Sequence, residues 1–270
     1  MKITKRIATA LAVIALGASV FADEAYDIVK KSSTLEAPDT SQAVMMISNI
    51  EKNGATELRE MRQYGRKVNG LKSTVFDFRS PASVKDTRVL QAEKNGHEDD
   101  RWIYMPNLRQ VRRIPMGERY KQFVGCEFTY NDMAIRHVDD DKHELLESNV
   151  KVTAGSKNYT CWKIKSVPLK KSEVEYSYRV QYIDTETYLP AKIEYYDKKD
   201  QNKIMKTYTT EDWKYLTSKT GKKYTMRMKA RIVNNISGRQ TFLEIKDPLM
   251  DAGVSDAYFT QQYLSTGKAK

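Results

Sequence analysis

The chain has 270 residues, of which 46 are Lys or Arg and 35 are Asp or Glu, and it is rich in tyrosine (17) and methionine (11). This length accommodates one large all-β domain or two small ones, and no stretch beyond residue 22 is apolar enough to cross a bilayer as a helix. The sequence contains no nucleophile elbow, no phosphate-binding glycine loop and no zinc-protease helix, so it gives no support to these enzyme classes.

The first 22 residues have the layout of a cleavable secretory signal. Three basic residues precede an uncharged run over residues 7–21, and Ala22 stands directly before Asp23. We expect cleavage after Ala22, a domain over residues 23–270 and a free periplasmic protein, since no cysteine ends the run. Outside the cytoplasm nucleic acid is excluded as a partner. The basic excess then favours anionic lipid headgroups, lipoproteins or an acidic protein surface, with a merely solubilising surface as the alternative.

The segment "DEAYDIVKKSS" (residues 23–33) predicts a short helix, and from Ser41 onward the chain reads as strands. Apolar residues alternate with polar ones in "STVFDF" (73–78), "YSYRVQYI" (176–183) and "YTMRMKARIV" (224–233). This period of two is typical of half-buried antiparallel strands. The residues expected on the apolar side are Phe76, Phe78, Tyr176, Tyr178, Val180, Tyr182, Met226, Met228, Ala230 and Ile232.

Turn motifs such as Asn-Gly separate these runs at short intervals and indicate roughly eleven strands in one curved antiparallel sheet. Such a sheet must close into a barrel, fold into a sandwich or be covered by helices. Two further helical candidates are "TYNDMAIRHV" (129–138) and "VSDAYFTQQYL" (254–264). Because helices are few and short, we expect a plug or lid on one domain.

Histidine and cysteine offer little chemistry. The run "HVDDDKH" contains two of the three histidines, but its spacing fits no established ligand set, so we predict no metal site and no cofactor. Cys126 and Cys161 are the only cysteines. In an oxidising compartment they could form a disulfide, and two buried free thiols fit equally well. We expect neither thiol to be catalytic.

The stretch "DRWIYMPNLRQVRRIP", read on through "ERYKQFVGCEFTYNDM", resembles the LolA-like superfamily of outer membrane lipoprotein-sorting proteins, particularly the branch that accompanies RND-type lipid exporters. The resemblance is carried by a Trp-x-Tyr-x-Pro strand, then basic residues, then an aromatic-Gly-small-acidic-aromatic turn that leads to an Asp. In this chain the matching residues are Trp102, Tyr104, Pro106, Arg109, Arg112, Arg113, Phe123, Gly125, Cys126, Glu127, Phe128, Tyr130 and Asp132. Cys126 departs from the pattern, because a small hydroxyl residue is expected there.

The resemblance implies an incomplete antiparallel β-barrel whose concave apolar face is plugged by short helices and a loop and holds acyl chains. It places Trp102 and Tyr104 inside the cavity and the arginines at its mouth, where they bind a phosphate or carboxylate. Alternatively, these arginines pair with Asp99, Asp100 or Glu118. The expected cavity residues are Phe76, Phe78, Trp102, Tyr104, Phe128, Tyr176, Tyr178, Tyr182, Met226, Met228 and Ile232, and the expected mouth residues are Arg109, Arg112 and Arg113.

The function that these residues and the resemblance imply is a non-catalytic periplasmic carrier. It binds a lipid or the acyl chains of a lipoprotein, takes them from an inner-membrane RND-type exporter and passes them to an outer-membrane acceptor, with transient contact to a membrane surface. The alternative is an envelope adaptor with a filled core that binds a protein partner through its sheet. An enzyme would need a convergent polar site, which the sequence does not show.

Overall fold

The structure, a computed structural model, describes residues 23–96 and 98–269. The expected secretory signal and His97 lie outside the described residues. The described chain forms one 13-stranded antiparallel sheet that does not close into a barrel, which confirms the predicted fold class. The strands are β1 (Thr40–Ile50), β2 (Thr56–Val68), β3 (Leu71–Ser80), β4 (Arg88–Ala92), β5 (Asp100–Met105), β6 (Gln110–Arg113), β7 (Asp141–Ala154), β8 (Lys157–Pro168), β9 (Arg179–Asp184), β10 (Pro190–Tyr196), β11 (Ile204–Thr217), β12 (Lys223–Asn234) and β13 (Gln240–Met250).

The strand count exceeds the expected eleven because two strands carry little sequence pattern. β4 is five residues long and four of them are buried, so both of its faces are covered and no alternation appears. β6 is only four residues long and none of them is buried. Short strands of this kind are recognised by their pairing with neighbours, and β4 pairs with both β3 and β5.

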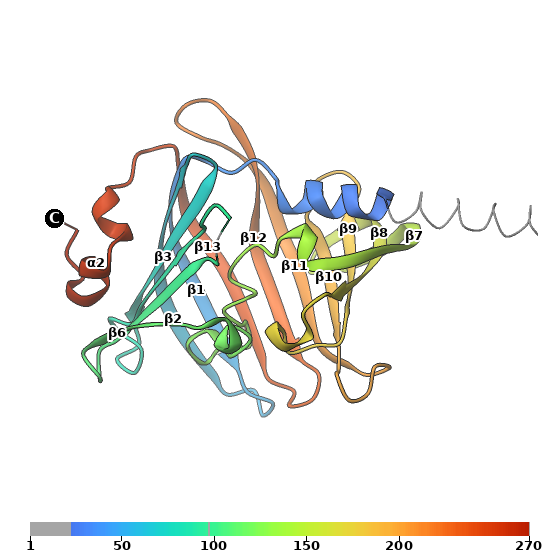
Figure 1. Cartoon of the computed structure of the whole chain (residues 1–270), viewed down its shortest axis with the longest axis horizontal. Coiled ribbons are helices and arrows are strands. Elements are labelled where there is room, and N and C mark those ends of the chain that lie inside the picture. The colour runs from blue at the N-terminus through green and yellow to red at the C-terminus, as the bar shows by residue number, and fades with distance from the viewer. Residues whose placement is uncertain (1–22, 97, 270) are drawn as a thin grey trace, which may run out of the picture.

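The order of the strands is a meander with one long-range pairing. The chain starts in the middle of the sheet at β1, runs outward hairpin by hairpin to the edge strand β6, crosses to the other edge at β7 and returns to β13, which pairs with β1. The crossing segment, residues 114–140, lies against the inner face of the curved sheet (Figure 1). We call it the plug.

Helices play a minor part. The expected N-terminal helix is present over residues 23–33 and packs on the inner face of β8 and β9 through Ile164 and Ile183. The expected closing helix is divided into a 3-10 turn (Asp256–Phe259) and α2 (Gln261–Thr266), and it covers the outer face of β2 to β5 (Figure 1). Residues 129–138 form mainly turns and not the expected helix, and Asp132 among them contacts Lys206 on β11.

Candidate functional site

The plug fills the inner face of the sheet with aromatic side chains. Phe123 is fully buried and its ring lies 5.3 Å from that of Phe76, 5.9 Å from Phe78 and 5.4 Å from Tyr130. The same cluster contains apolar residues from the far half of the sheet, such as Ile193 on β10. The plug therefore joins the two halves of the sheet through one shared core.

The local shape of the plug depends on two consecutive residues with positive φ. Val124 has φ 50° and Gly125 has φ 79°, which reverses the chain between Phe123 and Cys126. A left-handed valine is strained and needs outside support. Arg59 on β2 provides it, because its guanidinium donates a hydrogen bond to the carbonyl oxygen of Val124.

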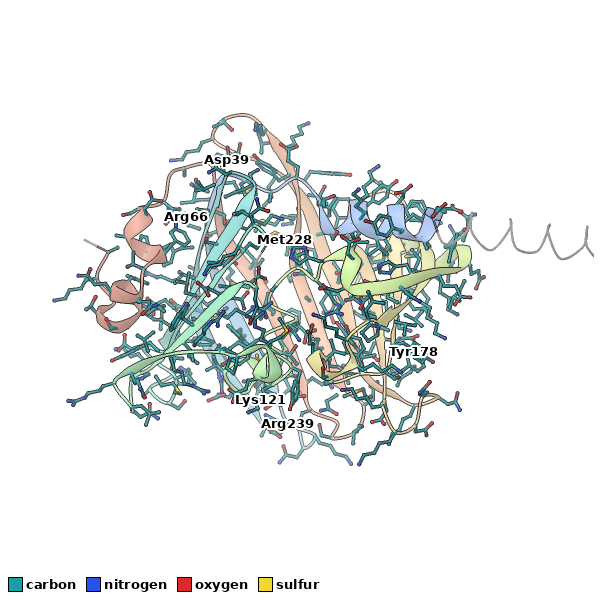
Figure 2. The ribbon with its side chains drawn as sticks, in the orientation of Figure 1. Asp39, Arg66, Lys121, Tyr178, Met228 and Arg239 are labelled. Atoms are coloured by element: carbon teal, nitrogen blue, oxygen red, sulfur yellow. The ribbon has the colours of Figure 1, made fainter. Side chains whose placement is uncertain are left out.

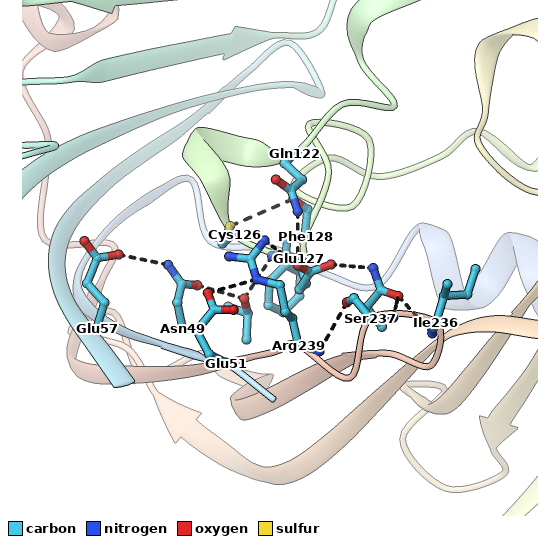
Figure 3. Close-up of polar contacts among 12 residues, drawn as sticks. Asn49, Glu51, Glu57, Gln122, Cys126, Glu127, Phe128, Ile236, Ser237 and Arg239 are labelled. Atoms are coloured by element: carbon cyan, nitrogen blue, oxygen red, sulfur yellow. Dashed lines mark hydrogen bonds and ion pairs between the residues drawn. The ribbon is translucent and has the colours of Figure 1, made fainter. Parts of the chain in front are cut away.

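A second polar contact holds the plug at Glu127 (Figure 3). Its carboxylate accepts hydrogen bonds from Gln122 at 3.1 Å and from Asn234 at 3.0 Å, and it lies 3.2 Å from the guanidinium of Arg239. Its backbone N–H donates to the hydroxyl of Thr241 at 2.9 Å. Glu127 is 5% exposed, and a buried carboxylate requires such a set of donors.

A buried ionic cluster holds the plug at Asp132, further along the chain. Lys206 on β11 is 4% exposed, and its Nζ lies 2.9 Å from Oδ2 of Asp132 in the plug and 2.7 Å from Oε1 of Glu175. The hydroxyl of Tyr195 donates to Oδ1 of Asp132 at 3.1 Å, and Thr129 donates to Oδ2. We call Asp132, Glu175 and Lys206 the latch.

Electrostatics keep two members of the latch, Asp132 and Lys206, charged near neutral pH. Burial alone would raise the pKa of Asp132, but the Lys206 ammonium and the hydrogen bonds from Thr129 hold that pKa below its ordinary value. Burial alone would lower the pKa of Lys206, but the carboxylates of Asp132 and Glu175 raise it above its ordinary value. Asp132 and Lys206 thus remain a fully charged buried pair.

The latch also holds a second covering segment. Glu175 belongs to residues 169–178, which link β8 to β9 and place Val174 and Tyr176 in the same core as the plug. The end of the plug is held by Asp141, which accepts from Arg136 at 2.7 Å and from Arg179 at 3.1 Å. The inner face is therefore covered by two chain segments, each bound to the sheet through charged groups.

Seven of the eleven expected cavity residues lie either on the inner face of the sheet or in the segments that cover it. Phe76, Phe78, Phe128, Tyr176 and Ile232 belong to the core that the plug shares. Met228 is buried on β12, in the middle of the sheet (Figure 2), and Met226 is partly buried two residues earlier on the same face. In the described residues the first five pack in this shared core and not around an open cavity.

Trp102 and Tyr104 lie on the opposite face from the one expected. Ile103 between them belongs to the inner core, so alternation turns both aromatic rings outward, where they pack against the C-terminal segment. Tyr178 and Tyr182 are also on the outer face, in a separate cluster with Val180 and Cys161. All four are corrections to the expected cavity. A period of two identifies residues that share a face, and only the covering segments decide which face that is.

Two of the three arginines expected at the mouth pair with carboxylates close to them in the chain. Arg112 lies 3.4 Å from Glu118, and Arg113 lies 3.3 Å from Asp100, as in the alternative interpretation. Arg109 occupies the turn between β5 and β6 with φ 49°. These two pairs agree with the alternative interpretation, and binding of a headgroup by the three arginines stays a prediction.

The cysteines are not bridged. Cys126 lies in the plug core and Cys161 in the outer-face cluster, so the two thiols are buried on opposite faces of the sheet. Burial raises the pKa of each thiol to about 12. The disulfide that the sequence left open is absent, and both sulfurs act as small core side chains.

Lys206, Tyr195 and Arg59 hold the plug, and sequence reasoning missed all three. One indication was available for Lys206. It stands two residues before Tyr208 in a strand, so its side chain points to the same face as that of a core residue. A lysine at such a position predicts a buried acidic partner. The identity of that partner depends on the path of the plug, which local pattern does not reveal.

Other candidate sites in the described residues give less support to a function. In the described part of the chain there is no group of three or more His, Cys, Asp or Glu that could hold a metal ion. His143 bonds Ser166 and Val138 through its two ring nitrogens. A depression of about 320 Å³ near Gly155 and Asp212 and one of about 230 Å³ near Glu57 are open and lined mainly by polar or charged residues. Among the described helices, none is long and apolar enough to span a membrane.

Comparisons with known proteins agree with this architecture. The model of a family described as uncharacterized proteins matches residues 70–266, which is more than half of the chain. A search of curated proteins found no match. An outer membrane lipoprotein-sorting protein domain from Vibrio parahaemolyticus has a similar structure, with a TM-score of 0.78 at 24% identity over 90% of this chain and 99% of that one.

Two other solved structures share the fold. A DUF1329 family protein from Desulfovibrio piger has a TM-score of 0.78 at 22% identity over 90% of this chain and 99% of that one. A LolA superfamily protein from Nitrosomonas europaea has a TM-score of 0.62 at 18% identity over 88% of this chain and 98% of that one. At these identities the likeness establishes the fold alone.

Proposed function

The chain belongs to the family of uncharacterized proteins whose model matches residues 70–266 and has the LolA-like fold, and from this premise we propose that it is a periplasmic carrier of a lipid or of lipoprotein acyl chains. The cargo occupies the inner face after the plug is displaced. In this proposal an inner-membrane RND-type exporter supplies the cargo and an outer-membrane acceptor receives it. No covalent step is required.

The observation that carries the proposal is that the inner face is covered by the plug, a chain segment that belongs to none of the strands of the sheet. It is joined to the sheet by an apolar core centred on Phe123 and by polar attachments at Val124, Glu127 and the latch, with a further one at its end through Arg136. A segment of this kind is an intramolecular competitor for the surface that an acyl chain would occupy. Removing the plug from the sheet would expose that surface to water.

Magnitudes show that an acyl chain can compete. Burying one methylene is worth about 0.8 kcal/mol, and burying a Phe side chain is worth about 1.5–3 kcal/mol. Two to four methylenes therefore offset each aromatic ring that the plug withdraws. A buried ion pair costs about 3–5 kcal/mol when one partner is removed, which about four to six methylenes offset. A single long acyl chain is comparable with the plug, so exchange between them is thermodynamically accessible.

The first test is native mass spectrometry of the protein purified from its own periplasm without detergent, followed by lipid analysis of the denatured sample. We expect a stoichiometric acylated ligand. A pair of variants tests whether the ligand binds on the inner face. Met228→Arg on the inner face should lower ligand occupancy, whereas Tyr182→Phe on the outer face should not. A ligand-free mass that does not change when lipids are offered would refute the carrier.

The filled inner face also favours a second function, the envelope adaptor. The described residues on this face pack against the plug and not around an open cavity, which is the core that an adaptor needs. An adaptor would bind a protein partner through its surface and would not respond to acyl probes. The same experiment separates the two functions, because an adaptor gives no extractable lipid.

A further inference from the structure

Strands β11 and β12 extend beyond the rest of the sheet as a two-stranded arm. β12 pairs with β13 only from Lys229 to Val233, and β10 pairs with β11 only as far as Thr209. Beyond these points the two strands pair with each other alone, up to Thr217 and Lys223. We define residues 213–227 as the arm, and Figure 1 shows its loop projecting at one rim of the sheet.

The arm carries only positive charge. No Asp or Glu occurs between Asp212 and Glu244, and the arm contains five basic residues, namely Lys214, Lys219, Lys222, Lys223 and Arg227. Lys222 lies 3.9 Å from Glu36, with both side chains more than half exposed, so this contact is weak. Within the described residues, Lys214, Lys219 and Lys223 have no carboxylate within ion-pair distance, although each residue is exposed.

Two of the five basic residues, Arg227 and Lys223, share one face of the arm with its aromatic side chains. The register pairs Trp213 with Arg227 and Thr217 with Lys223, so these residues and Tyr215 point to the same side. Tyr215 is 54% exposed and its ring lies 5.0 Å from that of Trp213, edge to face. Its hydroxyl donates to Glu186 at 3.5 Å, a contact at the limit of hydrogen bonding.

The arm is braced and does not hang free. The hydroxyl of Tyr224 donates to Asp251 at 2.8 Å, and the backbone N–H of Lys219 donates to the carbonyl oxygen of Met250 at 3.3 Å. Asp251, the other carboxylate near the tip besides Glu36, is therefore occupied by a hydrogen bond within the protein. The lysines of the arm are held outward on a fixed support.

We propose that the arm docks the protein onto anionic phospholipid headgroups at a membrane surface. An exposed Tyr and a partly buried Trp beside Lys and Arg form a composition that favours the boundary between water and lipid. The tyrosine ring enters the headgroup layer while the ammonium groups stay at the phosphates. A run of lysines without interspersed acids is attracted to a negatively charged surface. This inference rests on the proposed function, for which it names the membrane as a partner.

The test is co-sedimentation with vesicles of phosphatidylcholine alone or mixed with phosphatidylglycerol. We expect binding to the anionic vesicles only, and weaker binding as salt is added. Each basic residue near the surface contributes about 1 kcal/mol, or about fivefold. The double variant Lys219→Gln with Lys223→Gln should therefore bind about 25-fold more weakly. Tyr215→Ser should also reduce binding.

The matched control is Lys199→Gln with Lys203→Gln, which removes the same charge from an exposed hairpin that also contains Asp197 and Asp200. It should bind nearly as the unmodified protein does, and thermal unfolding should show that both double variants are folded. Equal loss in the two double variants would overturn the proposal, as would failure of the unmodified protein to bind anionic vesicles. Binding of the arm to an acidic protein only would also overturn it.

The same variants keep the two proposals distinguishable. An arm variant that still binds a fluorescent fatty acid in solution but loses vesicle binding supports docking by the arm. If the unmodified protein binds anionic vesicles through the arm but binds no fatty acid, the carrier function fails while the docking surface stands.

Discussion

Replacing Lys206 by methionine should release the plug without unfolding the sheet. Lys206 is the cation of the latch and contacts carboxylates from both covering segments at 2.9 and 2.7 Å. Methionine fills much of the same volume but leaves Asp132 and Glu175 buried without a cation. Oε2 of Glu175 already has no hydrogen-bond partner, so the site has little capacity to compensate.

The magnitude follows from removing one partner of a buried ion pair, which costs about 3–5 kcal/mol. Because about 1.4 kcal/mol is a factor of ten, the open population of the plug should rise by roughly 100- to 4,000-fold. The sheet retains its strand pairing, so we expect the cost to appear mainly in the covering segments. Asp132→Asn and Glu175→Gln, added to Lys206→Met, should recover much of the loss, since no buried charge then lacks a partner.

Hydrogen exchange read by mass spectrometry measures this directly in peptides from the plug and from the strands. Lys206→Met should accelerate exchange in residues 114–140 much more than in β1 or β13. The control is Lys192→Met, which breaks an ion pair to Glu194 on the outer face and leaves the plug untouched. Similar plug exchange in Lys206→Met and Lys192→Met would refute the latch. Failure of the triple variant to recover slow plug exchange would refute it as well.

Three further predictions concern pH, the inner face and the thiols. The pKa of Asp132 lies below its ordinary value, so the latch stabilises the closed plug above about pH 4 and loses this contribution as pH falls through the native pKa. Hydrogen exchange in the plug, corrected for the pH dependence of the intrinsic rate, should therefore be constant near neutrality and rise in stronger acid. Met228→Arg should reduce binding of a fluorescent fatty acid, whereas Trp102→Glu, on the outer face, should lower the thermal midpoint but leave that binding in the folded protein unchanged. Cys126 and Cys161 should resist a thiol reagent in the native protein and both react after unfolding without reductant, and a thiol count of zero would show a disulfide.

The sequence predicted the fold class because antiparallel strands carry their pattern locally. Alternation over residues 73–78, 176–183 and 224–233 identified strands that the structure contains in whole or in part, and the resemblance identified the plug motif around Gly125. Glu127 and Asp132 in that motif are the two carboxylates that attach the plug to the sheet. The sequence alone could not predict this role, because it depends on their partners in the sheet, such as Lys206 and Asn234.

What the sequence alone determined is therefore which residues alternate, where the chain turns and which segment is unusual. Only the tertiary structure decided which side of each strand faces inward, because a period of two is the same for either face. Trp102 and Tyr104 lie outside since the C-terminal segment covers them there, while the plug covers Ile103. The pairing of β1 with β13 and the contact of Asp132 with Lys206 join residues far apart in the chain, and no local preference specifies such partners.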